Sequence, residues 1–109
     1  MPHLRVRGVK PEVVQKLSEN LNTELAAMIQ TSPDNFTIEH VGTLFFLNGK
    51  AELGYPFVEV LWFDRPTEIR SRVAEHLTMR LRALVGPTDV AVVFVPLKPQ
   101  DYFENGKHF

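Results

Sequence analysis

The stretch Pro2-His3-Leu4-Arg5-Val6-Arg7 decides how the fold begins, because apolar and polar residues alternate along it. This period of two is typical of a β-strand with one buried face, here the face of Leu4 and Val6. A short connection follows, and its last residue, Pro11, suits the first turn of a helix. The opening of the chain therefore predicts a strand that leads directly into a helix.

The segment from Glu12 to about Gln30 is predicted to form one amphipathic helix, because its apolar residues recur at spacings of three and four. These residues are Val13, Leu17, Leu21, Leu25, Met28 and Ile29. Turn-forming residues over 31–35 end the helix. A β-rich run over 36–47 follows, with Gly42 as an expected bulge or bend, and then a turn and a loop to Tyr55.

A second unit with the same order follows. Residues 56–63 read as a strand that is mostly apolar on both faces, as a central or interface strand would be. A second helix is predicted from residues 64–67 to about Val85, where Gly86-Pro87 ends it. Residues 90–96 read as a short apolar strand, and the tail over 97–109 reads as irregular and rich in aromatic residues.

The two units look like copies of each other. A shift of 56 positions brings the apolar residues of the first helix onto Ile69, Val73, Leu77, Leu81, Leu84 and Val85. We therefore predict two β-α-β pseudo-repeats over about 2–47 and 56–96, followed by the tail. Their fold class is α/β (α+β), with a four-stranded mixed sheet and both helices on one face.

The other face of such a sheet is bare. It is predicted to carry Arg5, Arg7, Phe57, Glu59, Leu61 and Phe63. A mixed, aromatic-rich surface on so small a domain is a candidate subunit interface. If the first strands of the two units, over 2–7 and 56–63, are antiparallel neighbours, Glu59 should lie close to Arg5 or Arg7. Their pairing would offset the cost of burying charge in an interface.

Composition indicates an ordinary globular protein with a single domain over 1–109. Apolar residues make up 44% and charged residues 23%, and 12 Lys and Arg against 13 Asp and Glu leave a net charge of −1, which argues against a nucleic-acid partner. The chain has no cysteine, and its four histidines lack ligand spacing, so no metal site is expected. No signal peptide or apolar membrane span is visible, and the expected location is the cytoplasm.

Pro2 is the most informative single residue. Removal of the initiator methionine, which is usual before a small residue, would leave it as a free secondary amine at the start of a strand. An α-amino group titrates near ~7.7–8.0, and apolar surroundings lower that pKa. Such an amine is suited to act as a general base at physiological pH.

Pro2 opening a strand, the doubled β-α-β plan and the ending Tyr102-Phe103-Glu104-Asn105-Gly106-Lys107-His108-Phe109 together resemble the tautomerase superfamily. That superfamily includes 4-oxalocrotonate tautomerase, 5-carboxymethyl-2-hydroxymuconate isomerase and macrophage migration inhibitory factor. The start MPHLRVR (1–7), the stretch VEVLWF (58–63) and the end NGKHF (105–109) are similar, more closely, to the bacterial DUF1904 family. The resemblance covers essentially the whole chain.

The resemblance implies a homo-oligomer, a trimer, that uses no cofactor and tautomerises a small keto or enol acid. Carried over position by position, Pro2 is the base, and Arg65, in the second strand-to-helix connection, holds a substrate carboxylate. Tyr102 or Phe103 is the aromatic wall of the pocket, and Glu39 is the polar group from the strand after the first helix. The structural alternatives are a solvated surface charge for Arg65 and a paired strand charge for Glu39. For Tyr102 and Phe103 the alternative is an anchor that packs the tail on the next subunit.

Two functions stay open at this point. The first is a cofactor-free tautomerase or isomerase, although Lys10 in place of an arginine and a carboxylate at Glu39 argue against a dicarboxylate substrate. The second is a non-catalytic, self-associating binding or regulatory protein, because ferredoxin-like domains have the same element order. Retention of Met1 would favour the second, since Pro2 would then be an amide.

Overall fold

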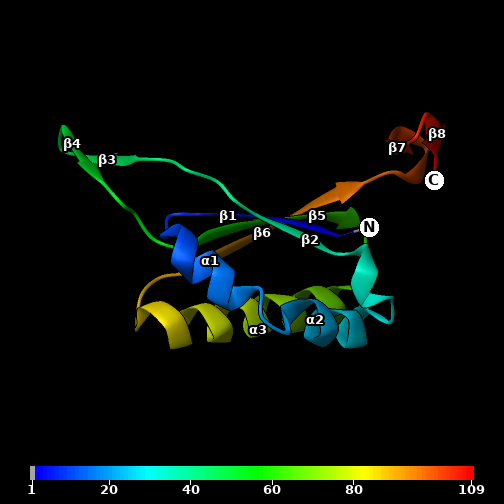
Figure 1. Cartoon of the computed structure of the whole chain (residues 1–109), viewed down its shortest axis with the longest axis horizontal. Helices are drawn as coiled ribbons and strands as arrows, with labels where there is room; N and C mark the ends of the chain where they lie inside the picture. Colours follow the sequence, from blue (N-terminus) through cyan, green and yellow to red (C-terminus); the bar gives the residue numbers. More distant parts are fainter. Residues whose placement is uncertain (1) are drawn as a thin grey trace.

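Four strands form the central sheet of the computed structural model, which describes residues 2–109 (Figure 1). The strand order is β2-β1-β5-β6. β1 (His3–Arg7) and β5 (Phe57–Phe63) are antiparallel neighbours at the centre. Each has a parallel partner at an edge, β2 (Thr37–His40) beside β1 and β6 (Ala91–Leu97) beside β5. The predicted mixed sheet of four strands is confirmed.

All the α-helices cover the same face of this sheet, as predicted (Figure 1). They are α1 (Pro11–Leu17), α2 (Leu21–Ile29) and α3 (Thr67–Val85). The sheet residues beneath them are almost completely buried: Leu4, Val6, Val58 and Val60. The alternation that predicted the strands therefore comes from a real division between a core face and an open face.

The prediction of one unbroken helix over 12–30 is wrong. The helix ends at Leu17 and resumes at Leu21, and Asn20 between them has a left-handed φ of +61°. Such a break leaves backbone carbonyl groups without helical partners. The guanidinium of Arg80, on α3, donates to the carbonyl oxygens of Leu17 at 3.1 Å and Glu19 at 3.0 Å. This contact from another element stabilises the break, and helical periodicity could not reveal it.

Two hairpins also differ from the prediction. The run over 36–47 is two strands, because the chain leaves the sheet after β2, and Gly42 lies in the irregular connection rather than in a bulge. β3 (Phe45–Leu47) pairs with β4 (Lys50–Glu52), in a segment predicted to be a turn and loop.

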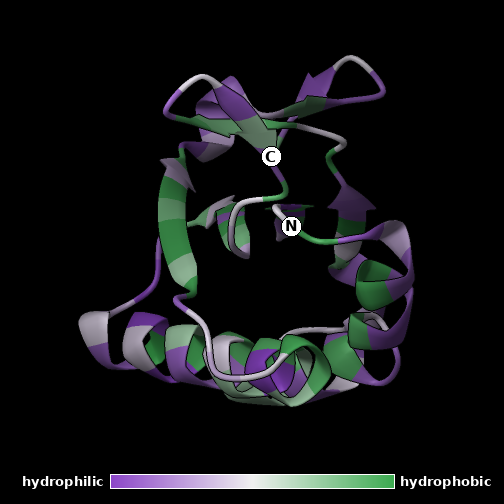
Figure 2. Ribbon diagram, turned by 90° about the vertical axis from the view of Figure 1, so that its left-hand side faces the viewer, coloured by the Kyte–Doolittle hydropathy of each residue, from purple (hydrophilic) through white to green (hydrophobic). Residues whose placement is uncertain are grey.

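The tail, predicted to be irregular, forms a short 3-10 helix, η2 (Pro99–Asp101), and then a hairpin of β7 (Phe103–Glu104) and β8 (Lys107–His108). A further 3-10 helix, η1 (Pro33–Asn35), precedes β2. Both hairpins project from the side of the sheet that faces away from the helices, as Figures 1 and 2 show. The turn predicted near Asn48-Gly49 is present, whereas the strand after it and the two short strands of the tail were not predicted.

Gly8 lies where the chain turns from β1 toward α1, and no other residue fits there without a shift. Its φ is +79°, and a Cβ atom would lie 1.9 Å from the carbonyl oxygen of Tyr55. Gly49, in the turn between β3 and β4, has a similar φ of +77° but no heavy atom within 4 Å of that position. The two glycines share the backbone conformation and differ in the space around them.

We expect Gly49→Ala to lower the free energy of unfolding by about 1 kcal/mol, the cost of a left-handed alanine. Gly8→Ala should lower it by roughly 2 kcal/mol more, because the Tyr55 backbone must move. Urea denaturation at one fixed protein concentration measures both values. Equal losses in the two variants would show that the approach to Tyr55 is not a real constraint.

A cluster of charged side chains holds α2 against α3. Glu24 Oε1 lies 2.7 Å from His76 Nε2 and 2.5 Å from Arg80 Nη1. The hydrogen bond from His76, reinforced by Arg80, holds the pKa of the Glu24 carboxyl below its ordinary value, against the opposing effect of burial. Ionised Glu24 therefore stabilises the folded state.

Because the folded-state pKa of Glu24 is depressed, this stabilisation is present above the ordinary pKa of 4.5 and is lost as the pH falls through the folded value. We expect Glu24→Gln to lower the free energy of unfolding by roughly 0.5–1 kcal/mol at pH 7. The difference from the parent protein should shrink below pH ~4.5. Glu75→Gln, at an exposed position on α3 with no ion pair among residues 2–109, is the control. A difference that stays constant with pH would contradict the assignment.

Candidate functional site at the Pro2 end of the sheet

Pro2 precedes β1 and is almost completely buried, with less than 2% of its surface exposed. Its carbonyl oxygen accepts a hydrogen bond from the Thr37 backbone N–H at 3.1 Å, which extends the β1–β2 pairing by one step. The register of the two neighbouring strands continues to place Pro2 beside Phe36 and opposite Trp62. Both neighbours are buried and aromatic, so Pro2 lies in apolar surroundings.

Trp62 and Arg65 form the polar part of this end of the sheet. The Trp62 ring stacks on Phe94 with 4.8 Å between centroids, and the Arg65 guanidinium lies over the indole at 5.7 Å. Arg65 Nη1 also donates to the carbonyl oxygen of Phe63. The Trp62 indole N–H is buried and has no hydrogen-bond acceptor among residues 2–109. A buried donor without a partner is costly and calls for an explanation.

A pocket of about 280 Å³ opens beside Arg65, between the end of α2 and the start of α3. Met28, Ile29 and Ile69 give it apolar walls, and Arg65 supplies the one basic side chain among its lining residues. This combination suits a small molecule with one anionic group and an apolar body.

The aromatic residues of the tail divide between two environments. The Tyr102 ring packs edge-on against Phe63, the last residue of β5, at 5.6 Å, and against Phe109 at 5.0 Å. Phe103 contacts His108 within its own hairpin and is 62% exposed. Tyr102 therefore belongs to the Pro2 end of the sheet, whereas Phe103 projects into solvent.

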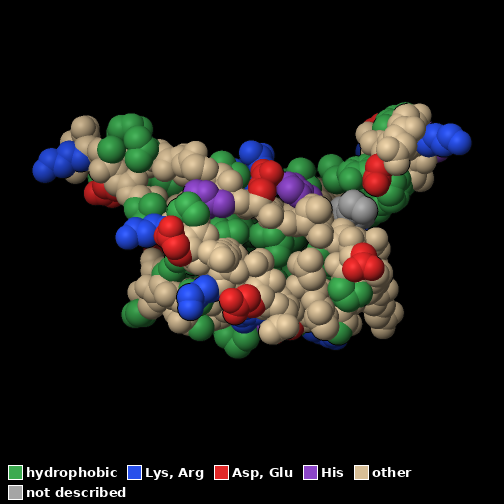
Figure 3. All heavy atoms as spheres, in the orientation of Figure 1, with side chains coloured by type: hydrophobic (Ala, Val, Ile, Leu, Met, Phe, Trp, Pro, Cys, Tyr) green, Lys and Arg blue, Asp and Glu red, His purple; other side chains and the backbone are tan. Residues whose placement is uncertain are grey.

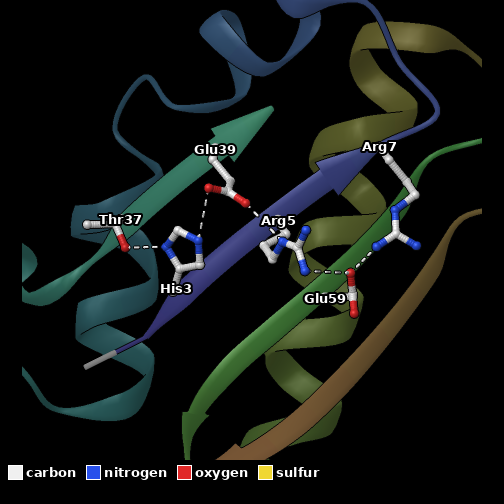
Figure 4. Close-up of polar contacts among 6 residues, drawn as sticks. All are labelled: His3, Arg5, Arg7, Thr37, Glu39 and Glu59. Atoms are coloured by element: carbon white, nitrogen blue, oxygen red, sulfur yellow. Dashed lines mark hydrogen bonds and ion pairs between the residues drawn. The ribbon is translucent and has the colours of Figure 1, made fainter. Parts of the chain in front are cut away.

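Glu39 lies on the open face of the sheet, in a chain of polar contacts that crosses three strands (Figure 4). Its oxygens lie 2.9 Å from Arg5 Nε and 3.4 Å from His3 Nε2, and His3 Nδ1 lies 2.5 Å from the Thr37 hydroxyl. We call the residues Thr37, His3, Glu39, Arg5, Glu59 and Arg7 the ion-pair chain. The interpretation of Glu39 as a paired strand charge is confirmed.

Glu59 continues the ion-pair chain from β1 to β5. It forms an ion pair with Arg7, and its Oε1 lies 3.8 Å from Arg5 Nη1. The predicted closeness of Glu59 to the two arginines is confirmed, and with it the register of the central strand pair. The space-filling view shows charged and histidine side chains gathered between the two projecting hairpins (Figure 3).

Residues 2–109 contain no group of three His, Asp or Glu side chains arranged to hold a metal ion. No helix in the same part of the chain is long and apolar enough to cross a membrane.

A family model described as "Domain of unknown function (DUF1904)" matches residues 1–108. The chain belongs to this family. A crystal structure of a DUF1904 domain from Sebaldella termitidis ATCC 33386 is 42% identical, covers 100% of both chains and has a TM-score of 0.96. A search of curated proteins finds no significant match.

Solved structures outside the DUF1904 family share its fold at low sequence identity. A macrophage migration inhibitory factor-like protein from Entamoeba histolytica is 12% identical, with a TM-score of 0.78 over 99% of this chain and 98% of that one. A fused 4-OT, described as an asymmetric trimer, is 15% identical, with a TM-score of 0.82 over 97% and 94%. The fold expected from the resemblance to tautomerases is therefore confirmed.

Within this DUF1904 chain, the structure brings Pro2, Arg65 and Tyr102 to one end of the sheet and leaves Glu39 and Phe103 apart from them. Trp62 is a further candidate that the sequence patterns did not single out, because its lack of a hydrogen-bond acceptor among residues 2–109 depends on how its neighbours pack. The signal available in the sequence was that this is the single tryptophan of the chain, immediately before the end of a strand.

Proposed function

We propose that this DUF1904 protein is a cofactor-free tautomerase in which Pro2, after removal of Met1, is the general base. The observation that carries the proposal is the burial of Pro2 between Phe36 and Trp62, at the end of the sheet where Arg65 lies. Apolar surroundings disfavour the ammonium form, so the pKa of the free amine would fall below its usual range of ~7.7–8.0. Neutral at physiological pH, the amine can take up a proton.

The proposed reaction needs one proton transfer in each direction. The Pro2 nitrogen removes a proton from the carbon next to the substrate carbonyl, and the bonding electron pair moves onto the carbonyl oxygen. The protonated Pro2 nitrogen then gives this proton to the enolate oxygen, which yields the enol and returns the base to its neutral form; the reverse sequence returns the keto acid. A hydrogen-bond donor aimed at the developing oxyanion lowers the barrier. The Trp62 N–H, which has no acceptor among residues 2–109, is the proposed donor.

Arg65 is the proposed partner of the substrate carboxylate, and the adjacent pocket takes the apolar body. Tyr102 is the proposed aromatic wall, because it packs on Phe63 at the same end of the sheet. We assign no substrate contact to Glu39, since both its oxygens are engaged by Arg5 and His3. One cation at the pocket favours a monocarboxylate over a dicarboxylate.

We also propose that the chain assembles as a trimer through the open face of the sheet. Phe57, Leu61 and Phe63 lie there only half-buried, and both hairpins extend beyond that face with exposed apolar side chains. A fused 4-OT of the same fold is described as a trimer, which supports this state. Exposed Phe103 is then free to contact a neighbouring copy.

The catalytic proposal is tested by comparing protein with and without Met1. Processed protein should tautomerise phenylpyruvate, and its rate should rise with pH through an apparent pKa below ~7.7, because only the neutral amine accepts a proton. Retained Met1 should abolish the reaction, and Pro2→Ala, which keeps a primary amine, should reduce it. Initial rates followed by absorbance, with intact mass recorded for each sample, provide the measurement.

Equal rates with and without Met1 would refute the role of Pro2. If processed protein is inactive against a panel of keto acids, the non-catalytic binding function takes the place of the tautomerase.

The trimer is tested with a charge placed on the open face. Val93, on the open face of β6, is 41% exposed, and Met79, on α3, is 56% exposed. Val93→Asp should lower the mass in light scattering from three times 12.5 kDa to 12.5 kDa, because an interface does not tolerate an unpaired buried charge. Met79→Asp should leave the mass unchanged. A monomeric parent protein at micromolar concentration, or the same mass for both variants, would contradict this interface.

A further inference from the structure

A second pocket lies at the opposite end of the sheet from Pro2, where β1 ends and β5 begins. Its volume is about 290 Å³, close to the 280 Å³ of the pocket beside Arg65. Val13, Pro56 and Val85 contribute apolar walls, and Lys10 contributes a cation. Leu53, which is 50% exposed, also lines it.

The two pockets occupy equivalent positions in the two β-α-β units. The same shift of 56 positions that relates the helices takes residues of one pocket onto residues of the other. Val9, Val13 and Ile29 become Arg65, Ile69 and Val85, and each of the six lines one of the two pockets. Two pockets of similar size, related by the internal repeat, indicate one kind of binding site built twice.

A buried proline precedes the first strand of each unit. Pro2 precedes β1 and Pro56 precedes β5, and Pro56 lines the pocket at its end of the sheet. The nitrogen of Pro56 lies inside the chain as a tertiary amide, so it has neither a proton nor basicity. The pocket beside Pro56 therefore lacks a basic proline amine.

Lys10 gives this pocket its charge preference. It is exposed and forms no ion pair with any residue over 2–109. The hydroxyl-bearing Thr88 is the other polar side chain of the lining, and no carboxylate lines the pocket. A cation at the rim of an apolar cavity recognises an anion attached to an apolar body. An apolar cavity of 150 Å³ holds benzene, so the volume here fits one aromatic ring with a short acidic side chain.

We propose that this pocket, formed by Lys10, Val13, Pro56, Val85 and Thr88, is a second, non-catalytic binding site for small aromatic or aliphatic monocarboxylates. It does not depend on the removal of Met1 or on any activity of Pro2.

The test uses phenylacetate as the probe and full-length protein that retains Met1, so that no turnover takes place. Amide ¹H–¹⁵N NMR should show saturable shifts at Gly8, Lys10, Gly54 and Thr88. Lys10→Gln should weaken binding about tenfold, the loss of a charge-assisted hydrogen bond. Lys16→Gln, at an exposed lysine on α1, the helix that begins directly after Lys10, should bind like the parent protein. Benzyl alcohol, which lacks the carboxylate, should also bind about tenfold more weakly than phenylacetate.

Three results would overturn the proposal: no saturable shift at these residues, shifts confined to residues around Arg65, or unchanged affinity in Lys10→Gln. None of these depends on tautomerase activity. Failure of the proposed reaction at Pro2 leaves the binding measurement valid, and failure of binding at Lys10 leaves the reaction at Pro2 valid.

Discussion

The antiparallel pairing of β1 with β5 joins the two halves of the chain, and the other contacts of the sheet build outward from it. Leu4 opposite Val60 and Val6 opposite Val58 turn four buried side chains toward the helices. A slip of one residue would send these side chains to the open face and the charged ones into the core. The same register sets Pro2 opposite Trp62 and Glu59 beside both arginines.

The ion-pair chain reinforces this register, and the pairing of its charges keeps their electrostatic cost small. Its cations and carboxylates alternate across β2, β1 and β5, so each carboxylate has a cation on either side or a histidine in reach. Partly exposed pairs contribute little stability individually, about 0–1 kcal/mol each. Their larger effect is selective, because a slip of two residues between β1 and β5 would set Arg5 opposite Phe57 or Leu61 in place of Glu59. The charged residues of the open face thus help to fix the strand register, whereas its apolar residues are suited to contact a neighbouring subunit.

Local patterns predicted the sheet because burial on one face imposes a period of two on every strand. The same patterns predicted α3 correctly but not the break between α1 and α2, which depends on Arg80 more than 60 positions away. Pro2 and Arg65 could be proposed from their places in the chain. The separation of Glu39 from these residues could not be predicted, because it follows from side-chain contacts with His3 and Arg5. The unpartnered N–H of Trp62 and the two related pockets likewise arise only from packing.

The central place of β1 has a consequence for how the chain folds. β1 is made first, yet both its neighbours come much later: Arg5 contacts Glu39 at a separation of 34 positions, and Arg7 contacts Glu59 at 52. Such non-local pairing slows folding, since long loops must close before any strand contact is gained. During synthesis β1 has no sheet partner until β2 emerges, and its antiparallel neighbour emerges later still. The early chain thus holds an open strand edge, and its charged residues, Arg5 and Arg7, are the kind of side chain that keeps such an edge from pairing with another molecule.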